Sequence, residues 1–418
     1  MSHPGALPSL SIPRSRAPRT RIRTKSWNIS PDRFREVCAS LAFDYLKWDL
    51  YLGGTCRVLP ESIVLSRDTH AHLVRITESC AGLMRRFEAN VRRDRRLMAE
   101  LGIDARLFPL LEAECAESPT FSRADFFLTP DGRWVLSEFN EDVPGGFNEA
   151  AGIPALLDAT ELGGEPVGDL RGSLCAAFAG CDAVGMVFAT AFSEDLQHCS
   201  VLARWLRDCG HRTLHASPEQ LRAHWAGPKL AGVPVQGVFR FYPAEWLPLL
   251  SNLPDWIRAL PRLQMMNPPL RLVSQSKRSF GLWRAGVAVH DADRELALQY
   301  CPETEPFDPR RVQHYRDRRE QLVLKQAFGR MGDAVLIGAL AAPERWDEAL
   351  AYGRRNPRDV AMQARFLVEP LQFDSGFLYP TIGVYAVNGH FAGYYSRVAP
   401  QPFITHEASH VATVIEAA

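Results

Sequence analysis

The sequence lacks an apolar run long enough to cross a membrane, which takes roughly 18 residues. A stretch such as VGMVFATAF at residues 184–192 has only the length of a buried strand. The composition, 46% hydrophobic and 23% charged residues, is that of an ordinary globular protein. At 418 residues the chain is long enough for two or three domains. These features predict a protein without a membrane partner.

Cysteine pairs at zinc-binding spacing are also missing. The nine cysteines are scattered along the chain, and no C-x-x-C pair occurs among them. An odd number of cysteines in a chain of this length favours reduced, mostly buried thiols and a cytoplasmic location. A zinc site is not expected.

Lysine is scarce. It occurs only five times, which leaves 43 of the 48 basic residues as arginine; the lysines are Lys25, Lys47, Lys229, Lys277 and Lys325. A compact ammonium group and a planar guanidinium are not interchangeable. Each lysine therefore marks a position where arginine can be unsuitable. Lys25 lies in a basic tail, and the contexts of Lys47 and Lys229 are typical of surface lysines.

The formal net charge is zero, but the charge is unevenly distributed. Residues 1–27 contain six basic residues and no acidic one, so the rest of the chain carries about six net negative charges. The segment is rich in Ser, Pro and Arg and has no apolar core, so it does not resemble a secretory signal. We predict a disordered basic tail. The alternative, an arm that binds nucleic acid, is the weaker interpretation, and no nucleic-acid partner is expected.

Periodicity of apolar residues indicates the order of the elements. Residues 28–118 have mainly helical spacing, and residues 121–140 have the pattern of a hairpin. Strands and helices alternate over residues 184–242, with a second helix after residue 216, which predicts a small parallel α/β unit. Residues 262–285 begin with the break NPP and continue as a helix. The last third contains strands and one helix at 343–354.

The predicted hairpin places polar side chains on one face. Asp131-Gly132 between two apolar runs favours a two-residue turn. That turn sets Asp125 opposite Glu138 and Arg123 opposite Asn140, all on one face because strand side chains alternate. Pro130 cannot donate the hydrogen bond beside the turn, so a one-residue bulge is an alternative. In either register, Arg123 and Asp125 share a face of the first strand, and Glu138 and Asn140 share a face of the second.

Two carboxylates directly across a strand pair repel each other unless something neutralises them. Mg²⁺ binds carboxylate and amide oxygens and keeps waters and phosphates as its other ligands. Asp125, Glu138 and Asn140 are therefore candidate magnesium ligands. In the alternative interpretation, Arg123 alone pairs with the acids on a solvated face.

A glycine-containing turn follows Lys325, which ends the apolar run QLVLK. Gly329 and Gly332 lie in this turn, where backbone N–H groups can approach phosphate oxygens closely. On local sequence alone a plain turn is the better explanation of the pattern. Lys277 follows NPP and is the second lysine of an arginine-rich region.

Two further polar residues interrupt apolar strands. Gln363 interrupts VAMQARFLVE, where a nucleotide base could bind exposed backbone, although an edge strand is the simpler interpretation. Arg240, in FRFYPAEW, is a candidate clamp for a substrate carboxylate through its bidentate fork. A structural ion pair between Arg240 and Glu245 explains the same pattern.

Taken in order, these motifs resemble the circularly permuted ATP-grasp ligases, the group that includes glutathionylspermidine synthetase. The resemblance covers residues 28–418. It depends on R-x-D at 123–125, E-x-N at 138–140, P-G-G at 144–146, N-P-P with Lys277, K-x-x-x-G-x-x-G at 325–332, Gln363, and a late Arg397. The metal hairpin precedes the phosphate loop, the reverse of the order in unpermuted ATP-grasp chains.

The resemblance implies a role for each matched position. It assigns magnesium to Asp125, Glu138 and Asn140, and ATP phosphates to Lys277, Lys325, Gly329 and Gly332. It assigns the adenine to Gln363 and the backbone near Phe366, and the ribose to Glu369. Arg123 and Arg397 would lie over the reacting phosphoryl and carboxylate groups.

The implied activity is that of an ATP- and Mg²⁺-dependent carboxylate–amine ligase that works through an acyl phosphate and releases ADP and phosphate. The partners would be a small-molecule or peptide carboxylate and an amine, with a homodimer as an open alternative to a monomer. The loop GRMG, the segment EDVPGG and the lack of a fused amidase depart from the synthetase, so its substrates are not carried over. A kinase on the same fold and a non-catalytic ATP-binding scaffold are the competing functions.

The expected fold class is α/β (α+β), a permuted ATP-grasp fold. Four segments are predicted: a tail at 1–27, a helical region with the metal-binding half at 28–180, a small parallel α/β domain at 181–262, and an ATP-binding lobe at 263–418.

Overall fold

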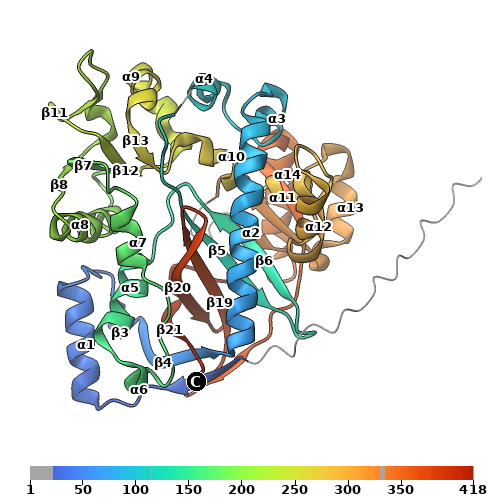
Figure 1. Cartoon of the computed structure of the whole chain (residues 1–418). Coiled ribbons are helices and arrows are strands. Elements are labelled where there is room, and N and C mark those ends of the chain that lie inside the picture. The colour runs from blue at the N-terminus through green and yellow to red at the C-terminus, as the bar shows by residue number, and fades with distance from the viewer. Residues whose placement is uncertain (1–21, 114, 330–334, 418) are drawn as a thin grey trace, which may run out of the picture.

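The computed structural model describes residues 22–113, 115–329 and 335–417 (Figure 1). Most of the predicted tail and Gly332 lie outside these ranges. The prediction of disorder is wrong for Ile22–Ser26, which form strand β1 and pair antiparallel with β4. Trp27, directly after β1, is buried. The tail prediction failed here because alternating Ile22 and Thr24 suit an edge strand, a pattern hidden by the arginines around it.

A central sheet joins the two ends of the described chain. Its strand order is β1-β4-β21-β20-β19-β5-β6, with β18 also paired to β19. The strands are β1, β4 (Val58–Leu65), β5 (Phe121–Leu128), β6 (Trp134–Asn140), β18 (Leu371–Phe373), β19 (Gly376–Val387), β20 (His390–Ala399) and β21 (Ser409–Ile415). The pair β4–β21 is parallel and the other pairs of the path are antiparallel. The sheet therefore contains strands from the predicted segments 28–180 and 263–418.

Helices cover both faces of this sheet. On one face lies α2 (Arg67–Val91), whose buried side chains pack with Phe126 and Val384 (Figure 1). On the other face, α5 (Phe147–Leu156) and α7 (Leu170–Ala176) pack around Phe121 and Tyr385. Because side chains alternate along a strand, odd-numbered residues of β5 point away from α2. Arg123 and Asp125 share that second face with Phe121.

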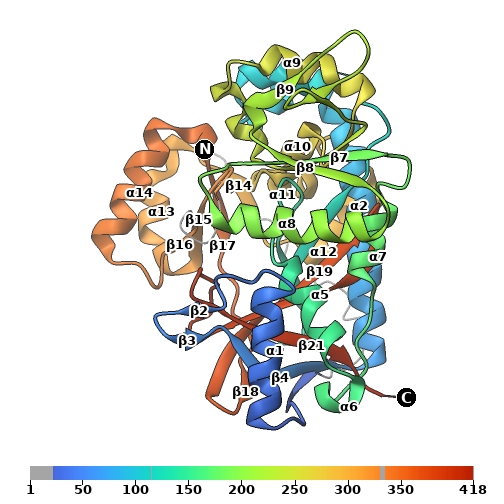
Figure 2. The same cartoon turned by 90° about the vertical axis from the view of Figure 1, so that its left-hand side faces the viewer.

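A second sheet forms the small α/β unit. Its order is β13-β12-β7-β8, and every pair is parallel, as predicted. Helix α8 (Ser193–Asp208) packs beside it, and the strands are β7 (Ala183–Phe188), β8 (Arg212–Ala216), β12 (Gly237–Phe241) and β13 (Gln264–Met266) (Figure 2). The predicted second helix after residue 216 is wrong. That stretch forms a small sheet of β9 (Leu221–Arg222), β10 (Lys229–Leu230) and β11 (Val233–Pro234).

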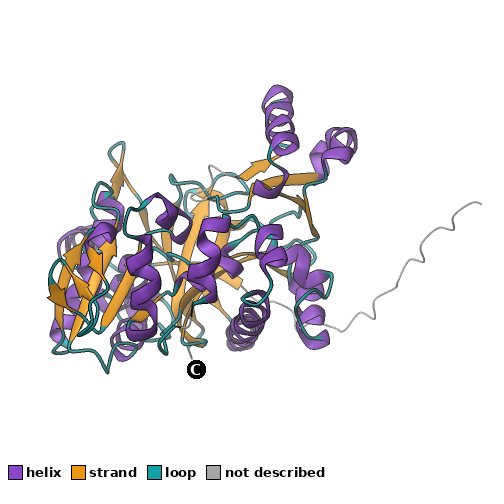
Figure 3. Ribbon diagram, turned by 90° about the horizontal axis from the view of Figure 1, so that it is seen from above, coloured by secondary structure: helices purple, strands orange, loops and turns teal. Residues whose placement is uncertain are grey.

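A third sheet, β14-β17-β15-β16, is antiparallel and carries Lys325. Helices α13 (Val312–Asp317) and α14 (Pro343–Arg355) lie to one side of it (Figure 2) and bury Tyr315 and Trp346 against it. The strands are β14 (Thr304–Pro306), β15 (Leu322–Gln326), β16 (Val335–Ile337) and β17 (Val360–Ala364). Seen from above, helices flank the strands throughout the molecule (Figure 3).

The remaining elements are short. The region predicted to be mainly helical contains α2 together with α1 (Pro31–Phe43), α3 (Arg95–Glu100) and α4 (Phe108–Glu112). The prediction is wrong for strand β4 and for the small hairpin of β2 (Tyr51–Leu52) and β3 (Thr55–Cys56). The predicted helix after NPP is divided into α10 (Leu272–Gln275) and α11 (Ser279–Arg284), with Lys277 between them. The other α-helices of the described residues are α6 (Ala159–Leu162), α9 (Leu253–Ala259) and α12 (Asp291–Tyr300).

Two predictions about composition can be compared with the fold. All nine cysteines are unpaired and most are buried, as predicted. Within the described ranges, none of the helices combines the length and the hydropathy required for a membrane span.

Candidate active site

The hairpin β5–β6 contains the two predicted pairs, but its loop is one residue longer than the predicted two-residue turn, because Thr129 N–H bonds to the carbonyl of Arg133. Arg123 faces Asn140 and Asp125 faces Glu138. The register shifts by one residue between Asp125 and Phe126, so the predicted bulge alternative is also present. The acid pair therefore lies on one face, above the bulge.

A glycine on the neighbouring strand makes room for these side chains. Gly383 of β19 pairs with Asp125. A Cβ at Gly383 would lie 2.9 Å from Arg123 Cδ and 2.5 Å from the carbonyl oxygen of Tyr395. Any larger residue would displace Arg123 or the adjacent strand. Sequence reasoning missed Gly383, whose only signal was a glycine within an apolar strand.

Two guanidinium groups and an amide contact the Asp125 carboxylate. The guanidinium of Arg123 donates to both of its oxygens, with N–O distances of 2.6 and 2.8 Å. Arg397 Nη2 lies 3.2 Å from Asp125 Oδ2. The side-chain amide of Asn140 donates to Asp125 at 3.1 Å and to Glu138 at 3.0 Å. Asp125 is only 2% exposed, and its charge is therefore shared among groups from three strands.

The two predicted phosphate lysines face Glu138. Lys277 Nζ lies 2.9 Å from Glu138 Oε2, and Lys325 Nζ donates to the Ser137 carbonyl at 3.1 Å. Burial alone would raise the pKa of Glu138, but the charges of Lys277 and Lys325 outweigh it and lower that pKa. Burial lowers the pKa of Lys325 to about 8, against the opposing effect of Glu138. The three groups form a compact charged cluster from β6, the α10–α11 link and β15.

A cavity of about 550 Å³ lies over this face. Most of the predicted site residues line it: Arg123, Asp125, Glu138, Asn140, Lys325, Gly329, Gln363, Phe366 and Arg397. Lys277 reaches the cavity through Glu138 rather than lining it. Gly332 falls outside the described residues. The backbone N–H of Glu369 bonds to the carbonyl of Leu128, and Glu369 is not among the described residues that line the cavity.

One part of the cavity is apolar. Val323, Val335, Ile337 and Phe366 contribute to its wall. The ring of Phe366 lies 5.6 Å from that of Phe127. Gln363 is buried in β17 and donates to Thr304 Oγ1 at 3.0 Å. Such a slot next to the lysine cluster has the character that a flat heteroaromatic ring requires.

Arg240 lies elsewhere. Its side chain is fully buried and forms an ion pair of 2.6 Å with Asp142. It also donates to the carbonyls of Asn267 and Tyr242. Arg240 is not among the described residues that line the cavity. The structure therefore gives Arg240 a structural role, with Asp142 as its partner, in place of the predicted carboxylate clamp.

The prediction that Lys47 is a surface lysine is wrong. Lys47 is 4% exposed, lines the cavity, and forms ion pairs with Asp49 at 2.8 Å and Glu149 at 3.3 Å. Arg57 and His410 line the same end of the cavity. The scarcity of lysine was the signal that could have identified Lys47. Its partner Glu149 is too distant in sequence for any local pattern to show the contact.

The residues at the acid pair fit a magnesium ion. Asp125 and Glu138 present carboxylates across one strand pair, and the Asn140 amide, which carries an oxygen as well as the nitrogen, touches both. This donor set is the hard-oxygen type that Mg²⁺ prefers. Among the described residues, no group of three or more His, Cys, Asp or Glu could hold a metal. Asn140 and oxygens from a substrate would therefore complete the coordination.

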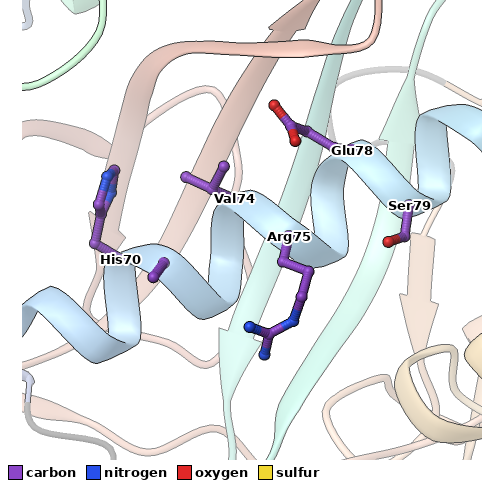
Figure 4. Close-up of a pocket in the computed structure, with 6 residues that line it drawn as sticks. His70, Val74, Arg75, Glu78 and Ser79 are labelled. Carbon is purple, nitrogen blue, oxygen red and sulfur yellow. The ribbon is translucent and has the colours of Figure 1, made fainter.

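A second depression lies on the outer face of α2. His70, Ala71, Val74, Arg75, Glu78 and Ser79 line it (Figure 4). All of these residues belong to one helix, and no paired carboxylates occur there. The candidate active site is therefore the cavity over β5–β6.

Comparisons with known proteins agree with this fold. The family model for glutathionylspermidine synthase preATP-grasp matches residues 38–416. No curated protein sequence matches the chain. A glutathione synthetase-like effector from Globodera pallida, in its apo form, has a TM-score of 0.62 at 12% identity, over 93% of this chain and 98% of that chain. At this identity the likeness concerns the fold alone.

A candidate gamma-glutamylcysteine synthetase from Methylobacillus flagellatus KT has a TM-score of 0.45 at 11% identity, over 81% of this chain and 88% of that chain. This second likeness is too weak to support an argument. The predicted family resemblance and the mixed α/β, ATP-grasp fold class are confirmed, while the circular permutation stays a prediction. The chain belongs to the glutathionylspermidine synthase preATP-grasp family.

Proposed function

We propose that this protein is an ATP- and Mg²⁺-dependent carboxylate–amine ligase that releases ADP and phosphate. One observation carries the proposal. Lys277 and Lys325, which are distant in sequence from the hairpin, converge on Glu138 of the acid pair, beside a cavity of about 550 Å³. Phosphoryl transfer depends mainly on positioning and charge neutralisation, and this cluster supplies the charged groups that both require.

ATP would lie along the lysine side of the cavity. Lys277 and Lys325 would hold its phosphates, with backbone N–H groups of the turn at Gly329. The apolar wall at Phe366 and the backbone near Gln363 would hold the adenine. Gly332 and Glu369 remain proposed contacts to phosphate and ribose. In this proposal the metal-binding hairpin precedes the phosphate-binding loop along the chain, which is the permuted order of the motifs.

Asp125, Glu138 and Asn140 would hold magnesium. When bound, the ion would neutralise phosphate charge and orient the transferred group. The chain's own residues prepare this position. Arg123 holds Asp125 by two hydrogen bonds, and Lys277 holds Glu138 in place.

Two arginines lie where the substrate carboxylate would react. Arg123 is committed to Asp125 and to the Gly145 carbonyl, so it orients the acid. Arg397 lines the cavity, and its buried Nε has no hydrogen-bond partner among the described residues. Arg397 makes one contact with Asp125, at 3.2 Å, and its remaining N–H groups would bind the substrate carboxylate. A carboxylate oxygen would attack the γ-phosphorus and release ADP. An amine would then attack the acyl carbon, which releases phosphate and a proton.

The test is release of ADP and phosphate with paired libraries of carboxylates and amines. We expect ADP release to depend on the carboxylate, and the amide product to appear only with an amine. A phosphorylated product that persists with every amine would indicate the kinase alternative. ATP binding without any ADP release would indicate the non-catalytic scaffold.

ATP affinity should also depend on pH through Lys325. Its pKa, lowered to about 8 by burial, means that Lys325 loses its proton within the range accessible to assays. Below that pH the ammonium attracts phosphate, and above it the neutral amine does not. We expect ATP affinity to fall as pH rises from about 7.5 to 9.5, by at most about tenfold per pH unit. Isothermal titration would measure this, and an affinity independent of pH would contradict it.

A further inference from the structure

A second polar cluster lines the same cavity and has no role in the ATP chemistry proposed above. We call it the distal cluster; its members are Lys47, Asp49, Arg57, Glu149 and His410. They come from the loop after α1, the residue between β3 and β4, helix α5 and strand β21. Both Glu149 and His410 are only 2% exposed.

An aromatic ring connects this cluster with the reaction face. The ring of Tyr395 lies 5.7 Å from the ring of His410. The guanidinium groups of Arg123 and Arg397 lie over the same Tyr395 ring, at 4.9 and 5.3 Å from its centroid. Gly146 permits this packing, because a Cβ there would lie 2.4 Å from the Tyr395 ring. The distal cluster and the two arginines are therefore one ring apart, within reach of one small substrate.

The members of the cluster differ in how completely they are bonded. Asp49 is well satisfied, with Lys47 at 2.8 Å, Arg57 at 2.5 Å and Gln197 at 3.0 Å. Glu149 lies 3.3 Å from Lys47 and 3.2 Å from His410, but neither of its oxygens has a hydrogen-bond partner in the described structure.

The same holds for both ring nitrogens of His410 and for Arg57 Nε. Buried polar atoms are normally hydrogen-bonded, so these unused groups need an explanation.

The unused groups include both donors and acceptors. Burial lowers the pKa of His410 to about 3, so its ring is neutral and has one acceptor nitrogen and one donor N–H. With the two oxygens of Glu149, the cluster has three acceptors that accept no hydrogen bond in the described structure, of which Glu149 Oε1 lies within ion-pair distance of Lys47 and His410. An ammonium group has three N–H donors. Arg57 Nε and the second nitrogen of His410 add free donors, which suit a carboxylate.

We propose that the distal cluster binds the zwitterionic amino-carboxylate end of the substrate, with the ammonium on Glu149 and His410 and the carboxylate on Arg57 and Lys47. This assigns an amino acid or peptide to the site and rests on the proposed ligase function. The charges of the four ionised residues of the cluster sum to zero. The cluster therefore stays neutral only if the bound end of the ligand has no net charge. A diamine would add positive charge beside Lys47 and Arg57. A simple carboxylate would leave both oxygens of Glu149 without a hydrogen bond.

The first test uses the wild-type protein and needs no variant. The probes are L-alanine, L-glutamate and L-lysine, each beside its N-acetyl and α-carboxamide derivatives, with glutarate and 1,4-diaminobutane as single-charge ligands. Ligand-observed NMR gives the relative affinities. We expect at least one free amino acid to bind at least about tenfold more tightly than its two derivatives, because each loses one charge-assisted contact. Equal binding of the derivatives, tighter binding of glutarate or the diamine, or no binding of any amino acid would overturn the proposal.

The second test is Glu149→Gln, which removes the charge and keeps the volume, with Glu194→Gln as the control. Glu194 lines the same cavity, is exposed, and lies outside the distal cluster. We expect Glu149→Gln to weaken amino-acid binding about tenfold or more while ATP affinity is unchanged, and Glu194→Gln to alter neither. Undiminished amino-acid binding by Glu149→Gln would overturn the proposal. If that variant fails to fold, the derivative series on the wild type decides alone.

ATP titration separates this inference from the proposed function. Amino-acid selectivity without ATP binding would support the assignment of the distal cluster and reject the proposed ligase function. ATP turnover without amino-acid selectivity would retain the ligase and reject the cluster assignment.

Discussion

Glu138→Gln is expected to remove nearly all ATP turnover while the protein stays folded. Glutamine keeps the volume and can still accept a hydrogen bond from Asn140, so the packing of β6 is preserved. The variant loses the one charge that faces both Lys277 and Lys325. Losing an electrostatic contact of this kind costs about 100- to 1,000-fold in rate. ADP release at saturating ATP and magnesium measures the loss.

The same variant should change the pH dependence of ATP binding. Glu138 supports the charged form of Lys325 against burial and against the nearby Lys277. Without that carboxylate, the pKa of Lys325 should fall further below 8, so the loss of ATP affinity should begin at a lower pH. Glu348→Gln is the matched control, because Glu348 is exposed and pairs only with the exposed Arg345 among its described ion pairs. ADP release at the wild-type rate from Glu138→Gln would exclude the hairpin from the active site.

The stability of the variant follows from the sign of the Glu138 pKa shift. Because the folded-state pKa is lowered, the carboxylate contributes stability above its unfolded pKa, and this contribution is lost as the pH falls through the folded value. At neutral pH the wild type therefore has this contribution, and Glu138→Gln lacks it. The expected result is a modestly lower melting temperature with unchanged cooperativity.

The hairpin was predictable because its information is local. Asp131-Gly132 sets the turn, and alternation along the strand then determines that Arg123 and Asp125 share a face. A one-residue bulge in β6 then places Leu136 and Glu138 on opposite faces, but Glu138 and Asn140 share the face of Arg123 and Asp125 as predicted. The same local logic identified the parallel α/β unit, in which each strand is followed by its own connection.

The features that the sequence did not predict depend on contacts between distant parts of the chain. Val58–Leu65 was included in a helical region, yet it pairs with β21 near the other end of the sequence. Lys47 lies in the loop after a helix, where no periodicity of apolar residues indicates that a side chain is buried. Its charge is compensated by Glu149, about a hundred residues later, and only the packing of α5 against α1 brings the two together. Arg240 was separated from Asp142 in the same way.

Lysine usage connects the predicted and the missed parts of the site. Of the five lysines in an arginine-rich chain, Lys47, Lys277 and Lys325 are buried beside one cavity. Lys229, on the small sheet of β9–β11, is half-buried and lies away from it. If the surroundings of each lysine explain why it is not arginine, substitution by arginine should be poorly tolerated at the three buried lysines and harmless at Lys229.

Lys325→Arg is therefore expected to lower the rate of ADP formation by about 100-fold, while Lys229→Arg changes nothing measurable. Lys325 is 5% exposed, and its Nζ donates to the Ser137 carbonyl at 3.1 Å. The guanidinium is larger and planar, so it cannot occupy this space without moving β6 or the turn at Gly329. A displacement of about 1 Å at the reacting phosphate can cost roughly 100-fold in rate.

The pH dependence separates this explanation from a simple loss of charge. Arginine stays protonated throughout the assay range, so Lys325→Arg should bind ATP with an affinity that no longer falls above about pH 8. The expected result is a slower enzyme whose ATP affinity is independent of pH. ADP formation and ATP titration for the two arginine variants, side by side, test both parts. If Lys325→Arg has the wild-type rate and still shows the decline above about pH 8, the titrating group is elsewhere and Lys325 does not hold a phosphate.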